Sequence, residues 1–324
     1  MKNKGIVLFL IVLAVVIVGI MVVDWYSKRP DNMEANKFEF SVDEFRNVPE
    51  ELVKYKETRN FNLGFVLAEA LEVANNKIYA VGDQELKIVD FSGTLLGEVG
   101  FLDEPHGLDV VGDTIYVVFE KFVWIVDETG TTIHKWEIEG EDTYLTAVAV
   151  EGEDIMVADA GNRRVLRFNH QGEIVNEFEG KTDDDLAHGF IIPSPYFDLD
   201  INAYGDLWVA NPGMHTMENY TKEGRLREFW KASGNQTENF SGCCNPAHFC
   251  FLPDGSFVTS EKGLVRVKIY KASGEFSGVV APPAKFDEKI EGQAPDVAVD
   301  DEGNIYALDF DRNVLRVFEP KISE

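Results

Sequence analysis

The stretch from Leu145 to Phe178 constrains the fold more than any other part of the sequence. Four short apolar runs lie within it, at positions 147–150, 155–158, 165–168 and 174–178, and turn residues separate them. This spacing leaves no room for a helix and predicts four antiparallel strands. One such sheet cannot bury both of its faces alone, so similar sheets are expected to pack on either side of it.

The same four-strand pattern recurs along the chain. The predicted second strands align as Lys77-Ile78-Tyr79, Thr114-Ile115-Tyr116, Asp154-Ile155-Met156, Asp206-Leu207-Trp208, Ser256-Phe257-Val258 and Asn304-Ile305-Tyr306. Successive copies are about 37 to about 52 residues apart, a spacing typical of propeller blades. The chain is therefore predicted to be an all-β protein, a six-bladed β-propeller of four-stranded antiparallel blades.

The sixth copy lacks a fourth strand, because its pattern stops at Pro320. A ring with one strand missing exposes an edge that favours aggregation unless another segment pairs with it. We expect Val53 to Thr58 to supply the missing strand. The first five copies each turn on a glycine after their third strand, at Gly93, Gly130, Gly172, Gly224 and Gly274.

An unbroken apolar run from Gly5 to Val23 opens the chain and approaches the ~20 residues that a membrane-spanning helix needs. Lys2 and Lys4 precede it, which favours a cytoplasmic N-terminus. A cleaved signal peptide is the alternative, although the run is long for one and no small-residue cleavage site follows. The expected organisation is a single-pass anchor at 1–27, a polar tether at 28–50 and a periplasmic or extracellular propeller at 51–324.

The charge of the chain limits its partners. It carries 57 acidic and 30 basic residues, a formal net charge of -27. Such a field opposes binding to nucleic acid or anionic lipid. Cations and basic partners remain, as does solubility alone.

One turn in the third copy, from Val157 to Val165, resembles the NHL repeat. Asp159 is expected to cap the turn amides, Gly161 and Asn162 to accept positive φ, and Arg164 to return to the carboxylate. A degraded copy follows in the sixth blade at 309–314. The resemblance implies a six-bladed propeller. NHL-type propellers include protein-binding modules and the peptide-amidating lyases, which are zinc enzymes with several axial histidines.

A candidate site follows from the blade alignment. The residues just ahead of the first strands are Ala70, Gly107, Ala147, Asp198, His248 and Asp296. First strands are innermost in a propeller, so these six should lie at one level around the axis. Asp198, His248 and Asp296 should then face one mouth of the channel, with His106 beside them. Such side chains could hold a divalent cation or a polar substrate group. The alternative is structural, with aspartates capping the strands and His248 binding a loop carbonyl.

Two long connections flank the fourth blade, from Gly180 to Tyr196 and from Lys231 to Cys244. Long connections in compact domains are usually functional or disordered. We expect both to meet over the mouth that Asp198 and His248 face, and this places Tyr196 in the candidate ligand-binding set.

All three cysteines, Cys243, Cys244 and Cys250, lie in one short segment beside His248. Outside the cytoplasm an oxidised pair is expected, which leaves one thiol over. Cys243 and Cys244 could form a vicinal disulfide, Cys244 could bridge to Cys250, or the thiols could join His248 at a metal. Cys250 aligns with alanines of other first strands, which favours a small packed side chain.

These features favour a binding or scaffold subunit for a protein, peptide or small ligand over an enzyme, and no catalytic residue or cofactor is assigned. Gly-rich phosphate loops and Gly-x-Ser-x-Gly elbows are absent from the sequence. The alternatives are a metal-dependent lyase or hydrolase acting at the axial mouth, for which only His248 lies on the ring with His106 beside it, and thiol-disulfide chemistry at Cys243 and Cys244.

Overall fold

The computed structural model describes residues 4–27, 45–180, 189–286 and 293–321, and the chain divides into two units, residues 1–42 and 43–324. In the first unit, helix α1 (Lys4–Ser27) has exposed apolar side chains along its length. It is long and apolar enough to cross a membrane, a property that it shares with signal sequences. Most of the expected tether, residues 28–44, lies outside the described residues.

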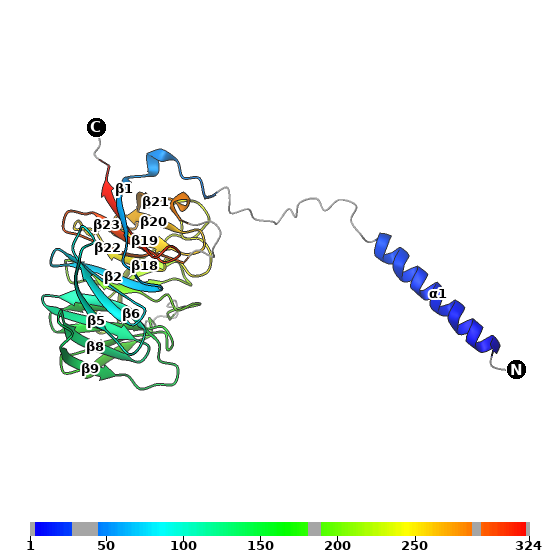
Figure 1. Ribbon diagram of the computed structural model, residues 1–324, viewed down its shortest axis with the longest axis horizontal. Helices are drawn as coiled ribbons and strands as arrows, with labels where there is room; N and C mark the ends of the chain where they lie inside the picture. Colours follow the sequence, from blue (N-terminus) through cyan, green and yellow to red (C-terminus); the bar gives the residue numbers. More distant parts are fainter. Residues whose placement is uncertain (1–3, 28–44, 181–188, 287–292, 322–324) are drawn as a thin grey trace. The chain divides into compact units, whose positions relative to one another are not determined.

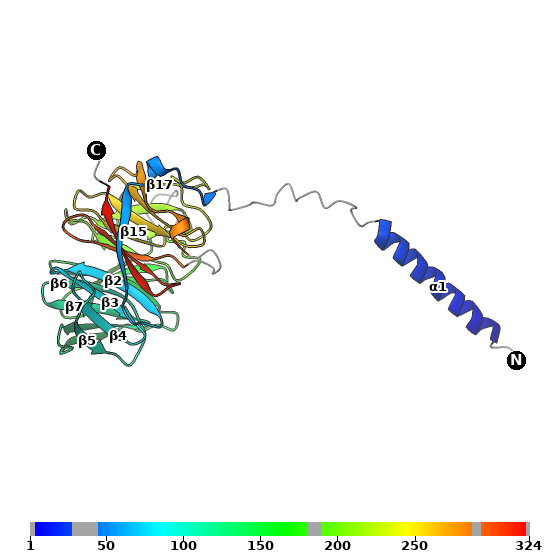
Figure 2. The same ribbon diagram turned by 45° about the horizontal axis from the view of Figure 1, so that its top comes forward.

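The second unit is the predicted six-bladed propeller, with six separate four-stranded antiparallel sheets (Figures 1 and 2). Blades one to three are β2 (Ala68–Ala74), β3 (Lys77–Gly82), β4 (Glu85–Val89), β5 (Leu95–Gly100); β6 (Pro105–Val111), β7 (Thr114–Phe119), β8 (Phe122–Asp127), β9 (Thr132–Glu137); and β10 (Leu145–Glu151), β11 (Asp154–Asp159), β12 (Arg164–Phe168), β13 (Ile174–Phe178).

Blades four and five are β14 (Leu199–Ile201), β15 (Leu207–Asn211), β16 (Thr216–Tyr220), β17 (Leu226–Lys231), and β18 (His248–Phe251), β19 (Phe257–Glu261), β20 (Arg266–Tyr270), β21 (Phe276–Ala281). The sixth comprises β22 (Asp296–Val299), β23 (Ile305–Asp309) and β24 (Val314–Pro320), to which the N-terminal β1 (Tyr55–Asn62) adds. Two short 3-10 helices, η2 (Glu50–Leu52) and η3 (Pro283–Lys285), precede β1 and follow β21.

The ring is closed by β1, which pairs antiparallel with β24 as the outermost strand of the sixth blade (Figure 1). The sequence placed this role at Val53 to Thr58. The strand observed starts two residues later and continues to Asn62, because its partner β24 runs from Val314 to Pro320 and offers backbone groups along that whole length. The edge of β24 is thereby covered.

The core of the propeller lies between blades. Each of six clusters of buried apolar side chains joins one blade to the next; Leu71 packs toward the sixth blade, for example, and its neighbour Ala70 toward the second. Successive side chains of a strand point to opposite faces of its sheet. Every blade therefore contributes to two cores, and no blade is complete without both neighbours.

The repeat turn of the third blade forms much as expected, with one correction. Asp159 accepts hydrogen bonds from Asn162 N (3.2 Å) and from Arg164 Nε (2.9 Å). The residue with positive φ is Arg163, however, rather than Gly161 or Asn162. Gly161 is needed for space, since a Cβ there would lie 1.7 Å from the carbonyl oxygen of Asp142.

Arg316 of β24 forms ion pairs at the junction between β1 and β24, which we call the seam. Its guanidinium lies 2.9 Å from Glu57 of β1 and 2.8 Å from Asp309 of β23, and all three side chains are largely buried. We expect Arg316→Ala to lower the free energy of unfolding by about 3 kcal/mol, because Glu57 and Asp309 lose the cation they share and keep only the more exposed Lys285 and Arg312. Urea unfolding measures this, and hydrogen exchange should show faster opening of the β1 amides.

Arg164→Ala is the matched control, since it breaks a comparable ion pair with Asp159 inside the third blade without touching β1. This variant should also be less stable while its β1 amides stay protected relative to the rest of the propeller. If both variants open β1 equally, Arg316 has no special role at the seam.

Candidate functional site

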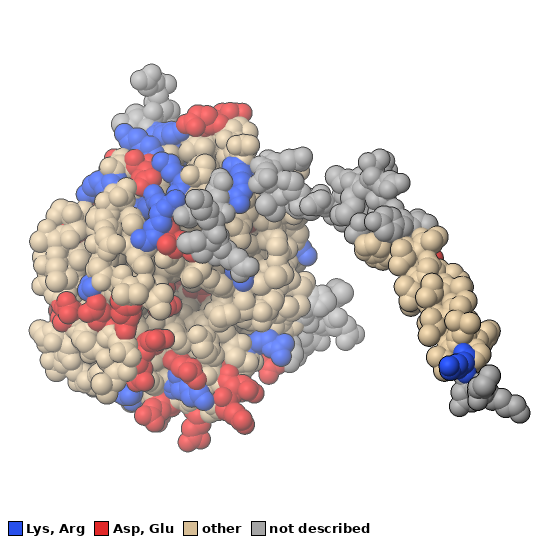
Figure 3. All heavy atoms as spheres, turned by 45° about the vertical axis from the view of Figure 1, so that its right-hand side comes forward, with Lys and Arg blue, Asp and Glu red and all other residues tan. Residues whose placement is uncertain are grey.

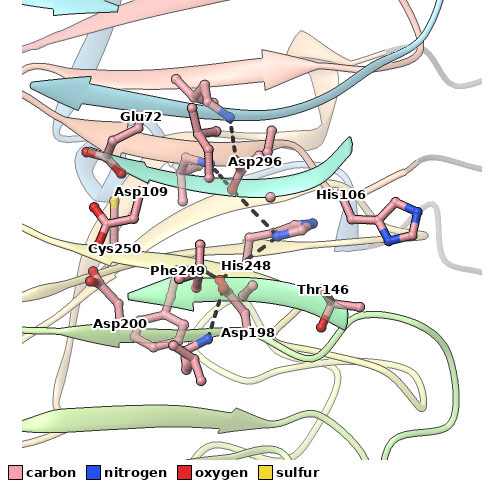
Figure 4. Close-up of a pocket in the computed structure, with 18 residues that line it drawn as sticks. Glu72, His106, Asp109, Thr146, Asp198, Asp200, His248, Phe249, Cys250 and Asp296 are labelled. Carbon is pink, nitrogen blue, oxygen red and sulfur yellow. Dashed lines mark hydrogen bonds and ion pairs between the residues drawn. The ribbon is translucent and has the colours of Figure 1, made fainter. Parts of the chain in front are cut away.

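The first strands place three predicted site residues together. Asp198 immediately precedes β14, while His248 and Asp296 begin β18 and β22. Figure 4 shows the three side chains facing one another inside the axial channel. His248 Nδ1 lies 3.9 Å from Asp198 Oδ2 and 3.6 Å from Asp296 Oδ1. The expected convergence on the axis is therefore present in the structure.

Both aspartates also support the ring. Asp198 accepts hydrogen bonds from Leu199 N (2.9 Å) in its own blade and from Phe249 N (2.9 Å) in the next. Asp296 does the same for Val297 N (2.9 Å) in its own blade and for Leu71 N (2.8 Å) in the first blade. These bonds link innermost strands of neighbouring blades. The structural role considered for the aspartates is thus present, and both residues also line the channel.

His248 has an unusual environment. Its Nε2 is buried and has no hydrogen-bond partner among the described residues. The rings of Tyr196 and Phe310 approach it edge-on, at centroid separations of 5.3 and 6.4 Å. Burial lowers the pKa of His248 to about 4. The imidazole is therefore neutral at physiological pH, and its contacts with the two aspartates, longer than hydrogen bonds, do not make an ion pair.

A cavity of about 220 Å³ adjoins Asp198 and His248, and we call it the mouth. Tyr196 and His106 line it, together with Glu69, Tyr144, Thr146, Pro195, Phe197, Gln293 and Phe310. His106 points away from the three axial side chains (Figure 4). Its Nδ1 lies 2.8 Å from the carbonyl oxygen of Leu145, and its ring stacks on Tyr144 with centroids 4.7 Å apart. It thus belongs to the wall of the mouth rather than to the axial ring.

A deeper level of the channel was missed by the sequence reasoning. Glu72, Asp109, Asp200 and Cys250 lie together two residues further along four first strands, around a narrow space of about 70 Å³ (Figure 4). Residues i and i+2 of a strand share a face, so the same alignment advanced by two positions would have found them. No Lys or Arg is among the described residues lining this channel.

Burial of like charges shifts the titration of the whole channel. Desolvation raises the pKa of Asp296 to about 7, that of Asp109 to about 6 and that of Asp200 to about 8. The pKa values of Glu72 and Asp198 are raised well above the ordinary range, by burial first and by neighbouring carboxylates second. The channel therefore holds several protons near neutral pH.

The cysteines are free thiols in the structure. Sγ of Cys243 and Sγ of Cys244 are 3.0 Å apart, so the predicted vicinal disulfide would need only a small approach, and it stays a prediction. Cys250 lies on β18 in the channel and packs partly against the core between the fifth and sixth blades, as expected for a small apolar side chain. Burial opposes ionisation of Cys244, yet hydrogen bonds from Cys243, Ser194 and Lys262 lower its pKa.

The two long connections meet beside the mouth. Lys262 Nζ lies 3.2 Å from Ser194 Oγ and 5.0 Å from the centroid of the Tyr196 ring, while Cys244 is hydrogen-bonded to Ser194. Residues 181–188 of the first connection lie outside the described residues. Among the residues that the structure does describe, no three His, Cys, Asp or Glu side chains are arranged to hold a metal ion.

The fold and the axial cavity define the chain as a six-bladed β-propeller. No protein-family model matches it. Over 156 residues it is 26% identical to a probable peptidyl-alpha-hydroxyglycine alpha-amidating lyase of Caenorhabditis elegans, and the match covers 42% of this chain and 41% of that protein. The chain thus matches less than half the length of this relative.

Solved propellers share the architecture at low identity. A protein of unknown function from Bacteroides thetaiotaomicron has a TM-score of 0.60 at 14% identity, covering 83% of this chain and 73% of that chain. A streptogramin B lyase has a TM-score of 0.56 at 13% identity, covering 84% of this chain and 100% of that chain. Likeness at this level shows the fold alone.

Asp200 gives a pH-dependent test of the channel. Burial, with Asp109 and Asp296 nearby, raises its folded pKa from 3.8 to about 8. The folded state therefore binds this proton more tightly than the unfolded state, and the resulting stability is present at low pH and lost as pH rises toward 8. We expect Asp200→Asn to exceed the wild type in unfolding free energy at pH 9 by on the order of 2 kcal/mol more than at pH 5.

Urea unfolding at the two pH values measures the effect. The exposed Asp113→Asn, in the turn between β6 and β7, serves as control and should shift little. A stability difference for Asp200→Asn that is the same at pH 5 and pH 9 would show that Glu72, Asp109, Asp198, Asp296 and Cys250 around it do not perturb its ionisation.

Proposed function

We propose that this protein is a membrane-tethered, extracytoplasmic propeller that binds a peptide or small ligand at the axial mouth, acting as a binding or scaffold subunit. The supporting observation is the cavity of about 220 Å³, at whose inner end His248 Nε2 is buried without a hydrogen-bond partner among the described residues. A buried polar atom without a hydrogen bond is costly, and a bound ligand would satisfy it. Helix α1 would supply the tether, with its N-terminus in the cytoplasm.

The mouth suits a small group better than a folded surface. Its walls come from several blades and include Tyr144, Tyr196 and Phe310, whose rings can pack against a side chain inserted from solvent. The propeller acts as a rigid frame, because each blade shares its core with both neighbours. A partner protein would reach this site through a protruding or flexible segment.

Filling the cavity tests the proposal. Thr146 of β10 lines both the mouth and the channel, so Thr146→Trp should block ligand access. We expect the full-length chain in detergent to enrich members of a random hexapeptide library in affinity selection read by mass spectrometry, and Thr146→Trp to lose this enrichment at least about tenfold.

Ile133→Trp, at an exposed position of outer strand β9, is the matched control and should bind like the wild type. Because Thr146→Trp also removes a hydrogen bond to the carbonyl oxygen of Phe197, His248→Gln is the second variant, and thermal unfolding checks that both fold. If neither change reduces enrichment, the ligand binds elsewhere and the proposed site is wrong.

The similarity to an amidating lyase favours a second candidate, lyase or hydrolase chemistry at the same mouth. The described residues do not form a cluster of metal ligands there, so a zinc-dependent version fits the side chains poorly. We expect substoichiometric zinc in elemental analysis of protein purified without chelator. One zinc per chain that disappears in His248→Ala would instead favour the enzyme.

A further inference from the structure

The mouth holds a carboxylate, Glu69, that none of the described residues neutralises. Glu69 lines the cavity and makes no hydrogen bond or ion pair with any residue that the structure describes. Burial raises its pKa to about 7, and the carboxylates of Glu104 and Asp83 contribute further. A half-buried anion surrounded by other anions is unfavourable, and a cation placed beside it would relieve the repulsion.

The surroundings reinforce the negative potential. Burial and the carboxylates of Glu69, Glu120 and Glu104 together raise the pKa of Tyr144. Glu104 and Glu120 line a second pocket, and His106 lines both this pocket and the mouth. In Figure 3, acidic side chains gather around a hollow in the face displayed, while basic ones are more frequent at the opposite edge of the propeller. The carboxylates of Glu69, Glu104 and Glu120 would repel an anionic ligand.

Two described lysines near the mouth, Lys121 and Lys262, already have other partners. Lys121 Nζ donates to the carbonyl oxygens of Gly140 and Glu141, at 3.3 and 3.1 Å. Lys262 Nζ donates to Ser194 Oγ and lies over the Tyr196 ring. No Lys or Arg is among the described residues that line the cavity itself. The part of the chain that the structure describes therefore provides no cation for Glu69.

The inner end of the mouth also presents an acceptor. The imidazole of His248 is neutral, and in the tautomer that carries its proton on Nδ1, the nitrogen facing Asp198 and Asp296, its Nε2 is unprotonated. Nε2 then offers a lone pair, and it has no donor within the described residues. Glu69 and His248 would thus both accept hydrogen bonds from N–H or O–H groups of a ligand.

We propose that the mouth selects an organic cation, an ammonium or guanidinium group that pairs with Glu69 while its carbon chain packs against Tyr144, Tyr196 and Phe310. This inference rests on the proposed binding function and names its ligand class. The aromatic rings favour an organic cation over a hydrated metal ion, because their faces attract a positive charge and their edges pack against methylene groups. The cation comes from a basic residue of a peptide or from a free amine.

Charge-matched probes test the proposal on the full-length chain in detergent at pH 8, above the pKa of Glu69. Saturation-transfer NMR titrations compare N-acetyl-lysine N-methylamide, the uncharged norleucine analogue, the glutamate analogue and free butylamine. We expect the lysine derivative to bind about tenfold more tightly than the norleucine derivative, and the glutamate derivative not to bind. Butylamine binding as well as the lysine derivative assigns a free amine, and weaker binding assigns a peptide.

Glu69→Gln keeps the size of the side chain and removes its charge. It should reduce affinity for the lysine derivative about tenfold and leave the norleucine derivative unchanged, because only the cation interacts with the charge. Glu98→Gln, at an exposed position of outer strand β5, is the matched control and should have no effect.

Equal affinity for lysine and norleucine derivatives, with both lost in Thr146→Trp, would overturn the charge preference and leave the binding site intact. Failure of all four probes to bind would also overturn it, and the peptide selection then judges the site separately. Lysine binding that survives in Glu69→Gln would place the cation elsewhere.

Discussion

The structure depends on the pairing of β1 with β24. A ring of similar sheets has no natural end, and the chain supplies only three strands to its last blade from the C-terminal side. Because every apolar core lies between two blades, an open ring would expose one such core as well as an unpaired strand edge. Arg316 reinforces this pairing by joining Glu57 on one side of the seam to Asp309 on the other. Closure therefore couples the stability of all six blades.

The same aspartates that link the blades also shape the site. Asp198 and Asp296 hold backbone amides of the following blade, so they are fixed in position whether or not a ligand is present. The two aspartates also lie close to Glu72, Asp109 and Asp200, in a channel with no described Lys or Arg side chain. Repulsion between these carboxylates is therefore unfavourable. Protonation relieves part of this repulsion. A rigid ring and a strongly acidic axis thus follow from one set of side chains.

The sequence predicted the architecture better than the site. Strand periodicity repeats in all six blades and the turn glycine in the first five, so several weak signals reinforce one another. The missing strand of the sixth blade pointed to an N-terminal partner. The blade alignment placed Asp198, His248 and Asp296 at one level because strand order fixes that geometry.

The alignment placed His106 less well, since the orientation of its side chain depends on stacking with Tyr144 and on the Leu145 carbonyl. The uncompensated state of Glu69 could not be read from sequence, because it depends on which lysines are already hydrogen-bonded.

The order in which the chain is synthesised makes the seam a late event. β1 leaves the ribosome first among the described strands, whereas its partner β24 is the last of them to appear. Until then β1 is an unpaired strand, and the nascent chain carries an open edge through nearly the whole of translation. A chain terminated before Val314 would never complete its last blade. Quality control during biogenesis, by chaperones or proteases that recognise exposed strands, would therefore act on this protein mainly before β24 is made.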